Sequence, residues 1–229
     1  PEVTDPLKAG KAAQFWCNLI YKAGWNETNY GPYGYYTMTA QKPVAFSVLA
    51  STGETINVAT NGVQAKNGHL YGAYLNMQYV DEGYVFLYLS NTDLSTGETS
   101  SFDAGMDYLY LAATETAQAA DGTVYGVFYS ADGNSLEWGT VDYETCQRTT
   151  IGPASQAFVA IGITKAGQIY AIGMDGKLYK VNKSTGEETL VGATGLTLTN
   201  LMGQYYGQSG EIDQRDDTFY WYCIDNQAQ

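Results

Sequence analysis

Histidine and cysteine are scarce in this sequence, which limits its metal and redox chemistry. Among 229 residues there are one histidine, His69, and three cysteines that form no CxxC pair. A site built from several histidines is therefore excluded. A Ser-His-acid triad would have to use His69, which opens a predicted strand where a solvent-facing role is favoured. The odd cysteine count excludes a fully paired framework. We interpret Cys17, Cys146 and Cys223 as small buried hydrophobic residues, with a Cys17–Cys223 disulfide as the alternative if the ends of the fold meet.

Basic residues are also few. The chain has 11 lysines and arginines against 24 aspartates and glutamates, which gives a net charge of −13 at pH 7. Surfaces that bind nucleic acid need clustered basic residues, so nucleic acid is excluded as a partner, and docking on an anionic lipid surface is disfavoured. The only arginines are Arg148 and Arg215, too few for the cluster with which a sialidase holds a carboxylate. The stretch 130–138, which approaches the sialidase Asp-box, is therefore interpreted as a hairpin turn.

Long hydrophobic runs and helical periodicity are absent. The longest apolar run, at 157–163, is far shorter than the roughly 20 residues that cross a bilayer, so we expect no membrane insertion. No stretch combines helical periodicity with helix caps, so helix should be nearly absent outside a possible segment at 5–13. The chain begins at Pro1 without a signal sequence, as expected of a processed, secreted or surface-anchored protein, or of one trimmed for expression. We therefore predict an extracytoplasmic location.

What the sequence does contain is a repeated phrase. Residues 176–192 read as strand, tight turn and strand, and weaker copies lie at 44–56, 86–99 and 138–152. A recurrence near ~45 residues with about four strands per unit is typical of a β-propeller. We therefore predict an all-β propeller with four to five visible four-stranded blades. The units span approximately 12–61, 62–105, 106–152, 153–195 and an incomplete 196–229.

Glycine-containing turns separate the strands within each unit. Asp-Gly and Asn-Gly pairs supply the positive φ values that tight hairpins need. Such pairs occur at 61–62, 67–68, 121–122, 132–133 and 175–176. The strand expected at 169–174 is apolar or small on both faces, as in a blade packed between two neighbours. The other strands expected in the fourth unit lie at 158–164, 178–182 and 188–192, and strands at 55–60 and 108–116 are expected in the first and third units.

The fifth unit stops after two predicted strands. A propeller must close on itself, because an uncovered blade exposes apolar surface. Three interpretations follow. The chain is a fragment of a longer propeller of roughly six to eight blades, its N-terminal segment completes a five-bladed ring, or a second chain completes the array. Another chain or a missing C-terminal segment is therefore among the possible partners.

The segment Leu178–Glu187 resembles the repeat of PQQ-type and kelch-like bacterial propellers, whose pattern is LYALDxxTGK. The resemblance extends over roughly four units and implies an extracytoplasmic propeller. Quinone-dependent dehydrogenases of this family carry a tryptophan after the Thr-Gly turn, where this chain has Ile56, Ile151 and Leu190. The family's calcium and quinone ligands have no match here. The chain is more similar to non-enzymatic surface propellers, which implies that it has no cofactor.

Tyrosine is abundant, with 21 residues, and most are expected at blade edges, where the ring packs and the hydroxyl stays wet. The segments 23–36 and 204–208 combine aromatic rings with Asn, Gln and Gly. This composition suits recognition, because rings stack on apolar surfaces and amides bind hydroxyls. An aromatic cover over one end of the core is the alternative. The candidate ligand-binding residues are Trp25, Tyr30, Tyr33, Tyr36, Tyr205 and Tyr206.

The densest acidic stretch is 211–217. Asp213, Asp216 and Asp217 could hold Ca²⁺ if the loop folded around an ion, but a plain β-turn explains them better, so no metal site is predicted. The sequence does not show whether any two carboxylates reach the separation that glycoside hydrolysis requires.

These observations favour a non-enzymatic extracytoplasmic binding or adhesion module, with a glycan or a protein as its ligand. It would use aromatic loops at one end of the propeller. The alternative is a propeller hydrolase or lyase that acts on extracellular polysaccharide, with carboxylates from different blades converging at the central channel. A third possibility is a scaffold whose blade edges pair with another chain.

Overall fold

A computed structural model of the chain describes residues 14–22, 30–39, 46–51, 57–76, 82–83, 86–105, 109–198 and 209–223, with side chains for 65–73, 82–83, 86–100, 110–198 and 209–223. These residues form seventeen strands, and helix among them is limited to short 3-10 turns such as η2 (Leu109–Leu111). No helix in the described ranges has the length and apolarity of a membrane span. The all-β prediction is confirmed.

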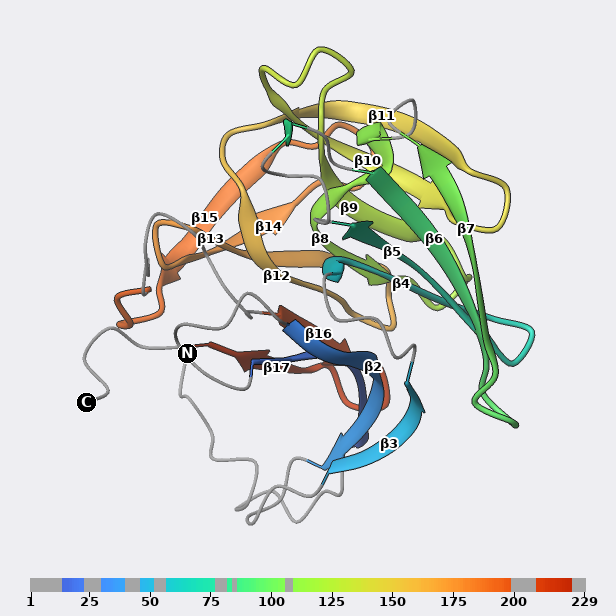
Figure 1. Ribbon diagram of the computed structural model, residues 1–229. Coiled ribbons are helices and arrows are strands. Elements are labelled where there is room, and N and C mark those ends of the chain that lie inside the picture. Colours follow the sequence, from blue (N-terminus) through green and yellow to red (C-terminus); the bar gives the residue numbers. More distant parts are fainter. Residues whose placement is uncertain are drawn as a thin grey trace.

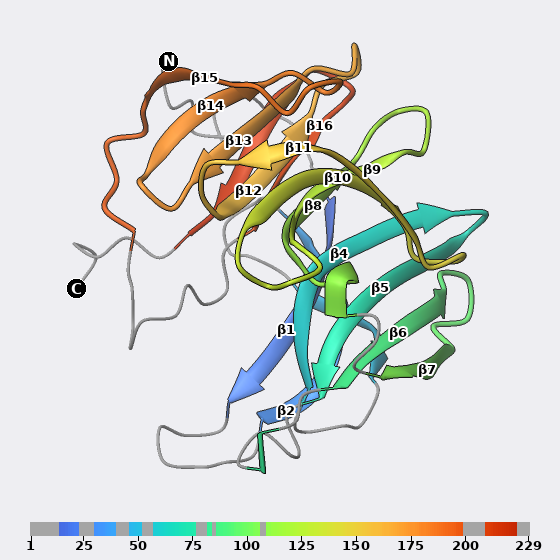
Figure 2. The same cartoon turned by 90° about the horizontal axis from the view of Figure 1, so that it is seen from above.

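The strands form five antiparallel sheets, each built from strands that are consecutive in the chain. Figures 1 and 2 show these sheets following one another around a common centre, as blades of a propeller. Blade one contains β1 (Gln14–Lys22), β2 (Tyr30–Thr39) and β3 (Phe46–Ser51), and blade two contains β4 (Asn57–Lys66), β5 (His69–Asn76), β6 (Phe86–Asp93) and β7 (Thr99–Gly105). Blade three contains β8 (Ala113–Gln118), β9 (Val124–Tyr129), β10 (Leu136–Asp142) and β11 (Gln147–Ala154). Blade four contains β12 (Phe158–Ile163), β13 (Ile169–Gly173), β14 (Lys177–Val181) and β15 (Glu188–Ala193), and blade five contains β16 (Ser209–Asp213) and β17 (Thr218–Tyr222).

The first strands of successive blades lie against one another at the centre, β4 with β8, β8 with β12, and β12 with β16. Burial decreases from these strands outward. All six residues of β12 are buried, whereas four of the six residues of β15 are exposed. This gradient follows from the architecture, because a first strand is covered by neighbouring blades and an outer strand faces solvent.

Two expected boundaries differ from the structure. The unit boundary expected at 61–62 lies inside β4, and the predicted strand 55–60 belongs to blade two. The Asn61-Gly62 pair falls where the pairing of β4 with β5 shifts register, so it marks an irregularity within a strand and not a turn. The predicted strand 108–116 is divided into η2 and β8. The completion of blade five lies outside the described residues, so the three interpretations of closure stay predictions.

The described core consists of apolar clusters at the seams between blades. The largest side chain at the seam between blades three and four is Trp138 of β10, which is 1% exposed. Its ring lies 5.1 Å from that of Phe158 on β12, and Phe158 meets the ring of Tyr179 edge-on at 5.8 Å. Blades are thus joined mainly by side-chain packing.

The Thr-Gly-Glu phrase of the repeat has a structural role at this seam. Gly186 has a positive φ of 73°, and a Cβ built on it would lie 3.3 Å from Trp138. Trp138 Nε1 donates a hydrogen bond to Glu188 Oε1 at 2.8 Å, and the amide of Ser155 donates to the same oxygen at 3.0 Å. The Ser155 hydroxyl donates to Glu188 Oε2. The turn of blade four is thereby fastened to a tryptophan of blade three, although no tryptophan follows the turn in sequence.

We expect Glu188→Ala to lower the free energy of unfolding by about 1–3 kcal/mol, because the buried Trp138 Nε1 loses its acceptor. Urea denaturation followed by circular dichroism measures the loss. Glu187→Ala is the matched control, since Glu187 is the exposed neighbour in the same turn. Equal stability of the two variants would contradict the role given to Glu188.

Candidate functional site

Two glutamates lie among the first strands, one on β8 and one on β16. Glu115 is 2% exposed. Its Oε1 accepts a hydrogen bond from the amide of Thr116 at 2.9 Å, and its Oε2 is buried with no partner of good geometry among the described residues. The Ser209 hydroxyl and the Gly210 amide lie close enough to favour its charged form. Glu115 therefore faces the start of β16 across the centre of the array.

Glu211 connects three blades. Its Oε1 accepts the amide of Ile212 at 2.9 Å, and the amides of Gln118 on β8 and Ile163 on β12 also donate to its carboxylate. Beside it, Gln214 Nε2 donates to the carbonyls of Gln118 at 2.9 Å and Ile163 at 3.2 Å. First strands are sheet edges with unpaired amides and carbonyls, which need partners when buried. Glu211 accepts from these amides, and Gln214 donates to the carbonyls.

We call Glu115 and Glu211 the central carboxylates. Burial is the largest influence on the pKa of each. Burial raises the pKa of Glu115 well above its ordinary value, and the nearby charge of Glu211 raises it further. Burial also raises the pKa of Glu211 to about 8, although hydrogen bonds from the three amides lower it. A neutral carboxylic acid beside a second carboxyl group can exchange protons with a bound molecule. In this protein both carboxyl groups are also hydrogen-bonded to backbone amides.

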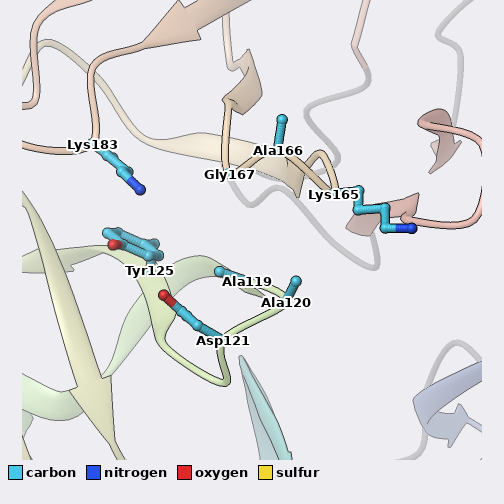
Figure 3. Close-up of a pocket in the computed structure, with 8 residues that line it drawn as sticks. All are labelled: Ala119, Ala120, Asp121, Tyr125, Lys165, Ala166, Gly167 and Lys183. Atoms are coloured by element: carbon cyan, nitrogen blue, oxygen red, sulfur yellow. The ribbon is translucent and has the colours of Figure 1, made fainter.

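A pocket opens at the seam between blades three and four, at the end of the propeller where the first strands finish. It is a shallow, open depression with a volume of about 140 Å³. Figure 3 shows the Tyr125 ring on one side of the pocket, with Lys183 above it and Asp121 below. The pocket is lined by Ala119, Ala120, Asp121, Tyr125, Lys165, Ala166, Gly167 and Lys183.

The charged side chains of this pocket differ in their partners: Asp121 is hydrogen-bonded, whereas the two lysines form no ion pair among the described side chains. Asp121 accepts the amide of Thr123 at 2.9 Å, and hydrogen bonds from Thr123 lower its pKa, with a further contribution from Lys183. Lys183 Nζ lies over Gly167, where a built Cβ would be 3.3 Å from it. Among the described side chains, neither Lys183 nor Lys165 forms an ion pair, whereas Lys66 and Lys177 do.

The aromatic candidates fall largely outside the described residues. Trp25, Tyr205 and Tyr206 are not described, and for Tyr30, Tyr33 and Tyr36 the structure describes the backbone of β2 and not the side chains. The strand begins at Tyr30, so the loop expected at 23–36 ends earlier than expected. The aromatic binding site stays a prediction.

The acidic stretch 211–217 contains a turn between β16 and β17. The amides of Asp216 and Asp217 donate to the carbonyl of Asp213 at 3.2 and 2.8 Å. The Asp213 carboxylate pairs with Arg215, and Asp217 Oδ1 accepts the amide of Lys165 at 2.8 Å. Within the described ranges, no group of three or more His, Cys, Asp or Glu side chains is placed to hold a metal ion.

Other candidate groups are bonded within their own blades. His69 Nδ1 lies 2.8 Å from Asn91 Oδ1. The stretch 130–138 contains a hairpin turn in which the Ser130 hydroxyl donates to Asp132 at 2.6 Å. Arg148 donates to the carbonyls of Tyr110 and Tyr129 at 2.7 and 2.6 Å and pairs with Glu137.

Sequence reasoning did not identify Glu115, Tyr125 or Lys183, and it noted Glu211 only as the first residue of the acidic stretch 211–217. The only signal for the glutamates was a charged residue inside a strand of small and apolar neighbours. Such a residue is rarely buried without partners. Tyr125 and Lys183 are 58 residues apart in number, from 125 to 183, and no local pattern connects them.

Solved structures resemble this fold, whereas no protein-family model and no curated protein matches the chain. A GH43_1 enzyme from Xanthomonas citri complexed with xylotriose is 13% identical, with a TM-score of 0.57 over 92% of this chain and 77% of that chain. The RS223 β-xylosidase is 11% identical, with a TM-score of 0.55 over 91% of this chain and 81% of that chain. A protein of unknown function from Bacteroides thetaiotaomicron is 15% identical, with a TM-score of 0.42 over 84% of this chain. The present chain spans only 51% of the length of that protein. At such identities the likeness shows the fold alone, and that fold is a β-propeller.

Proposed function

We propose that this protein is a non-enzymatic binding module that acts outside the cytoplasm and holds a ligand at one end of its propeller. The observation that carries the proposal is a contrast between two groups of polar side chains. The central carboxylates accept hydrogen bonds from strand amides, with Glu115 buried and Glu211 half-buried. The pocket at the seam between blades three and four instead presents Tyr125 and Lys183 to an open depression of about 140 Å³.

A glycan is the first ligand to test. A tyrosine ring bordered by an ammonium group and a carboxylate can pack on the apolar face of a sugar and bind its hydroxyls (Figure 3). Two proteins of similar fold are carbohydrate-active enzymes, one of them complexed with xylotriose. The aromatic segment with Trp25 remains a second proposed contact region.

Calorimetric titration with a panel of neutral and acidic oligosaccharides tests the proposal. We expect at least one saturable ligand, and we expect Tyr125→Leu to weaken it about tenfold by removing the ring and the hydroxyl. Tyr170→Leu is the matched control, since Tyr170 is the half-buried tyrosine near the start of the second strand of the next blade. Trp25→Ala in the same titration tests the aromatic segment. If no oligosaccharide binds, or if both tyrosine variants behave alike, the pocket is not a glycan site.

The alternative, a hydrolase or lyase that acts on extracellular polysaccharide, is favoured by one observation: two carboxyl groups with raised pKa values come from different blades, and the charge of Glu211 raises the pKa of Glu115. Release of reducing ends or unsaturated products from a polysaccharide panel would show activity. Glu115→Gln and Glu211→Gln should each abolish it. Activity that survives both substitutions would exclude these carboxylates as the catalytic groups.

A further inference from the structure

We infer that the ligand of the pocket at the seam between blades three and four carries a negative charge, and that it is an oligosaccharide containing a uronic acid. This inference rests on the proposed function of the same pocket. It begins from charge balance. The chain has 24 acidic and only 11 basic residues, and among the cations whose side chains the structure describes, Lys165, Lys180 and Lys183 form no ion pair. Two such lysines, Lys165 and Lys183, line this one pocket.

The other described cations, apart from the exposed Lys180 on β14, form ion pairs. Lys66 pairs with Asp142 and Glu144, Lys177 with Asp175, and both arginines with carboxylates of their own blades. Lys183 does not pair in this way. Asp121 is near enough to feel its charge, but the Asp121 carboxylate is held by the amide of Thr123 at 2.9 Å.

The position of Lys183 makes it the principal recognition group. It lies in the turn between β14 and β15, and its ammonium reaches over Gly167 toward the space above Tyr125 (Figure 3). Lys165 is on the opposite rim, with its ammonium directed outward (Figure 3). Counting Asp121, the three charged side chains of the lining sum to one positive charge, opposite in sign to the chain as a whole.

The rest of the lining indicates what carries the anionic group. Ala119, Ala120 and Ala166 give a low, apolar rim beside the tyrosine ring. A ring-shaped molecule can rest there with one face on Tyr125 and its carboxylate toward Lys183. A sugar acid has this combination of an apolar face, hydroxyls and a carboxylate, whereas a free inorganic anion would leave the ring and the alanines unused.

The experiment compares an oligogalacturonate with the same oligosaccharide after reduction of its carboxyl groups, and with inorganic sulfate, by calorimetric titration at about 50 and 500 mM salt. We expect the acidic form to bind at least about tenfold more tightly than the reduced form, and its affinity to fall at high salt. Lys183→Ala should remove the preference, and Lys183→Arg should retain part of it. Lys180→Ala is the matched control, since Lys180 is exposed on the preceding strand and does not line the pocket.

The outcomes are distinct. Equal, salt-insensitive binding of the acidic and reduced forms would overturn this inference and leave the glycan-binding function standing. Sulfate binding that displaces the sugar acid and depends equally on Lys183 would reduce the pocket to a general anion site and would also overturn it. If neither oligosaccharide binds, the inference and the proposed glycan site fail together. Lys183 is exposed, so its variants should fold, and circular dichroism checks that they do.

Discussion

Trp138→Ala is expected to lower the free energy of unfolding by about 3–5 kcal/mol. The side chain is 1% exposed and packs between Phe158, at 5.1 Å between ring centroids, and the Gly186 turn. Removing it opens a cavity at the seam between blades three and four, and it leaves Glu188 without one of its donors. The seam cannot close around the cavity easily, because backbone from both blades already meets there. A Cβ built on Gly152 would lie 2.3 Å from the Thr185 carbonyl oxygen.

Urea denaturation followed by circular dichroism measures this loss. Tyr129→Ala is the control, since Tyr129 is an aromatic residue of the same blade that is 48% exposed, and it should cost much less. Trp138→Phe should fall between the two, because it keeps part of the packing and loses the hydrogen bond to Glu188. A loss below about 1 kcal/mol for Trp138→Ala would mean that this seam does not limit the stability of the propeller.

The stability of the protein is expected to decrease as the pH is raised from 5 to 9. Glu211 keeps its proton up to a pKa of about 8 in the folded protein, whereas in an unfolded chain glutamate loses it near ~4.3. Between these pKa values the folded state binds more protons than the unfolded state. The free energy of unfolding therefore falls with rising pH and levels off above the folded pKa. Burial also raises the pKa of Glu115, so Glu115 acts in the same direction.

Glu211 alone should contribute on the order of 3 kcal/mol to this decrease, less than the full shift implies because the residue is only partly buried. Carboxylates with lowered pKa values do not oppose it in this range. Asp132, with a pKa of about 2 caused first by the Ser130 hydroxyl, contributes a constant amount from pH 5 upward and loses it only in acid.

Urea titrations of the native protein at pH 5, 7 and 9 test the sign. Glu211→Gln, which cannot ionise, should flatten the pH dependence and raise stability at pH 9 relative to the native protein. Glu187→Gln removes an exposed carboxylate and should keep the native slope. The prediction fails if the native protein is equally stable at pH 5 and pH 9. It also fails if the stability of Glu211→Gln depends on pH as strongly as that of the native protein. Either result would show that burial does not raise the pKa of Glu211.

Local patterns predicted the individual blades well where turn chemistry was unambiguous. In blade four, the four expected strands agree with the structure to within one residue at each end, because Asp175-Gly176 and the Thr185-Gly186 turn impose positive φ. The same reasoning failed at Asn61-Gly62, because an Asn-Gly pair also suits an irregularity in a continuous strand. A dipeptide alone does not distinguish the two, since the pairing partner decides.

The sequence by itself thus determined the repeating antiparallel hairpins and the all-β class. These properties follow from alternation, turns and composition, which are local or additive. Only the tertiary structure decided which blades meet through Trp138, that Glu115 and Glu211 come together at the centre, and that Lys183 reaches the Tyr125 pocket without a carboxylate partner among the described residues. Each of these contacts joins residues at least 50 positions apart, 138 to 188, 115 to 211 and 125 to 183. They are set by how neighbouring blades pack, and a pattern within one repeat carries no information about the side chains of the next.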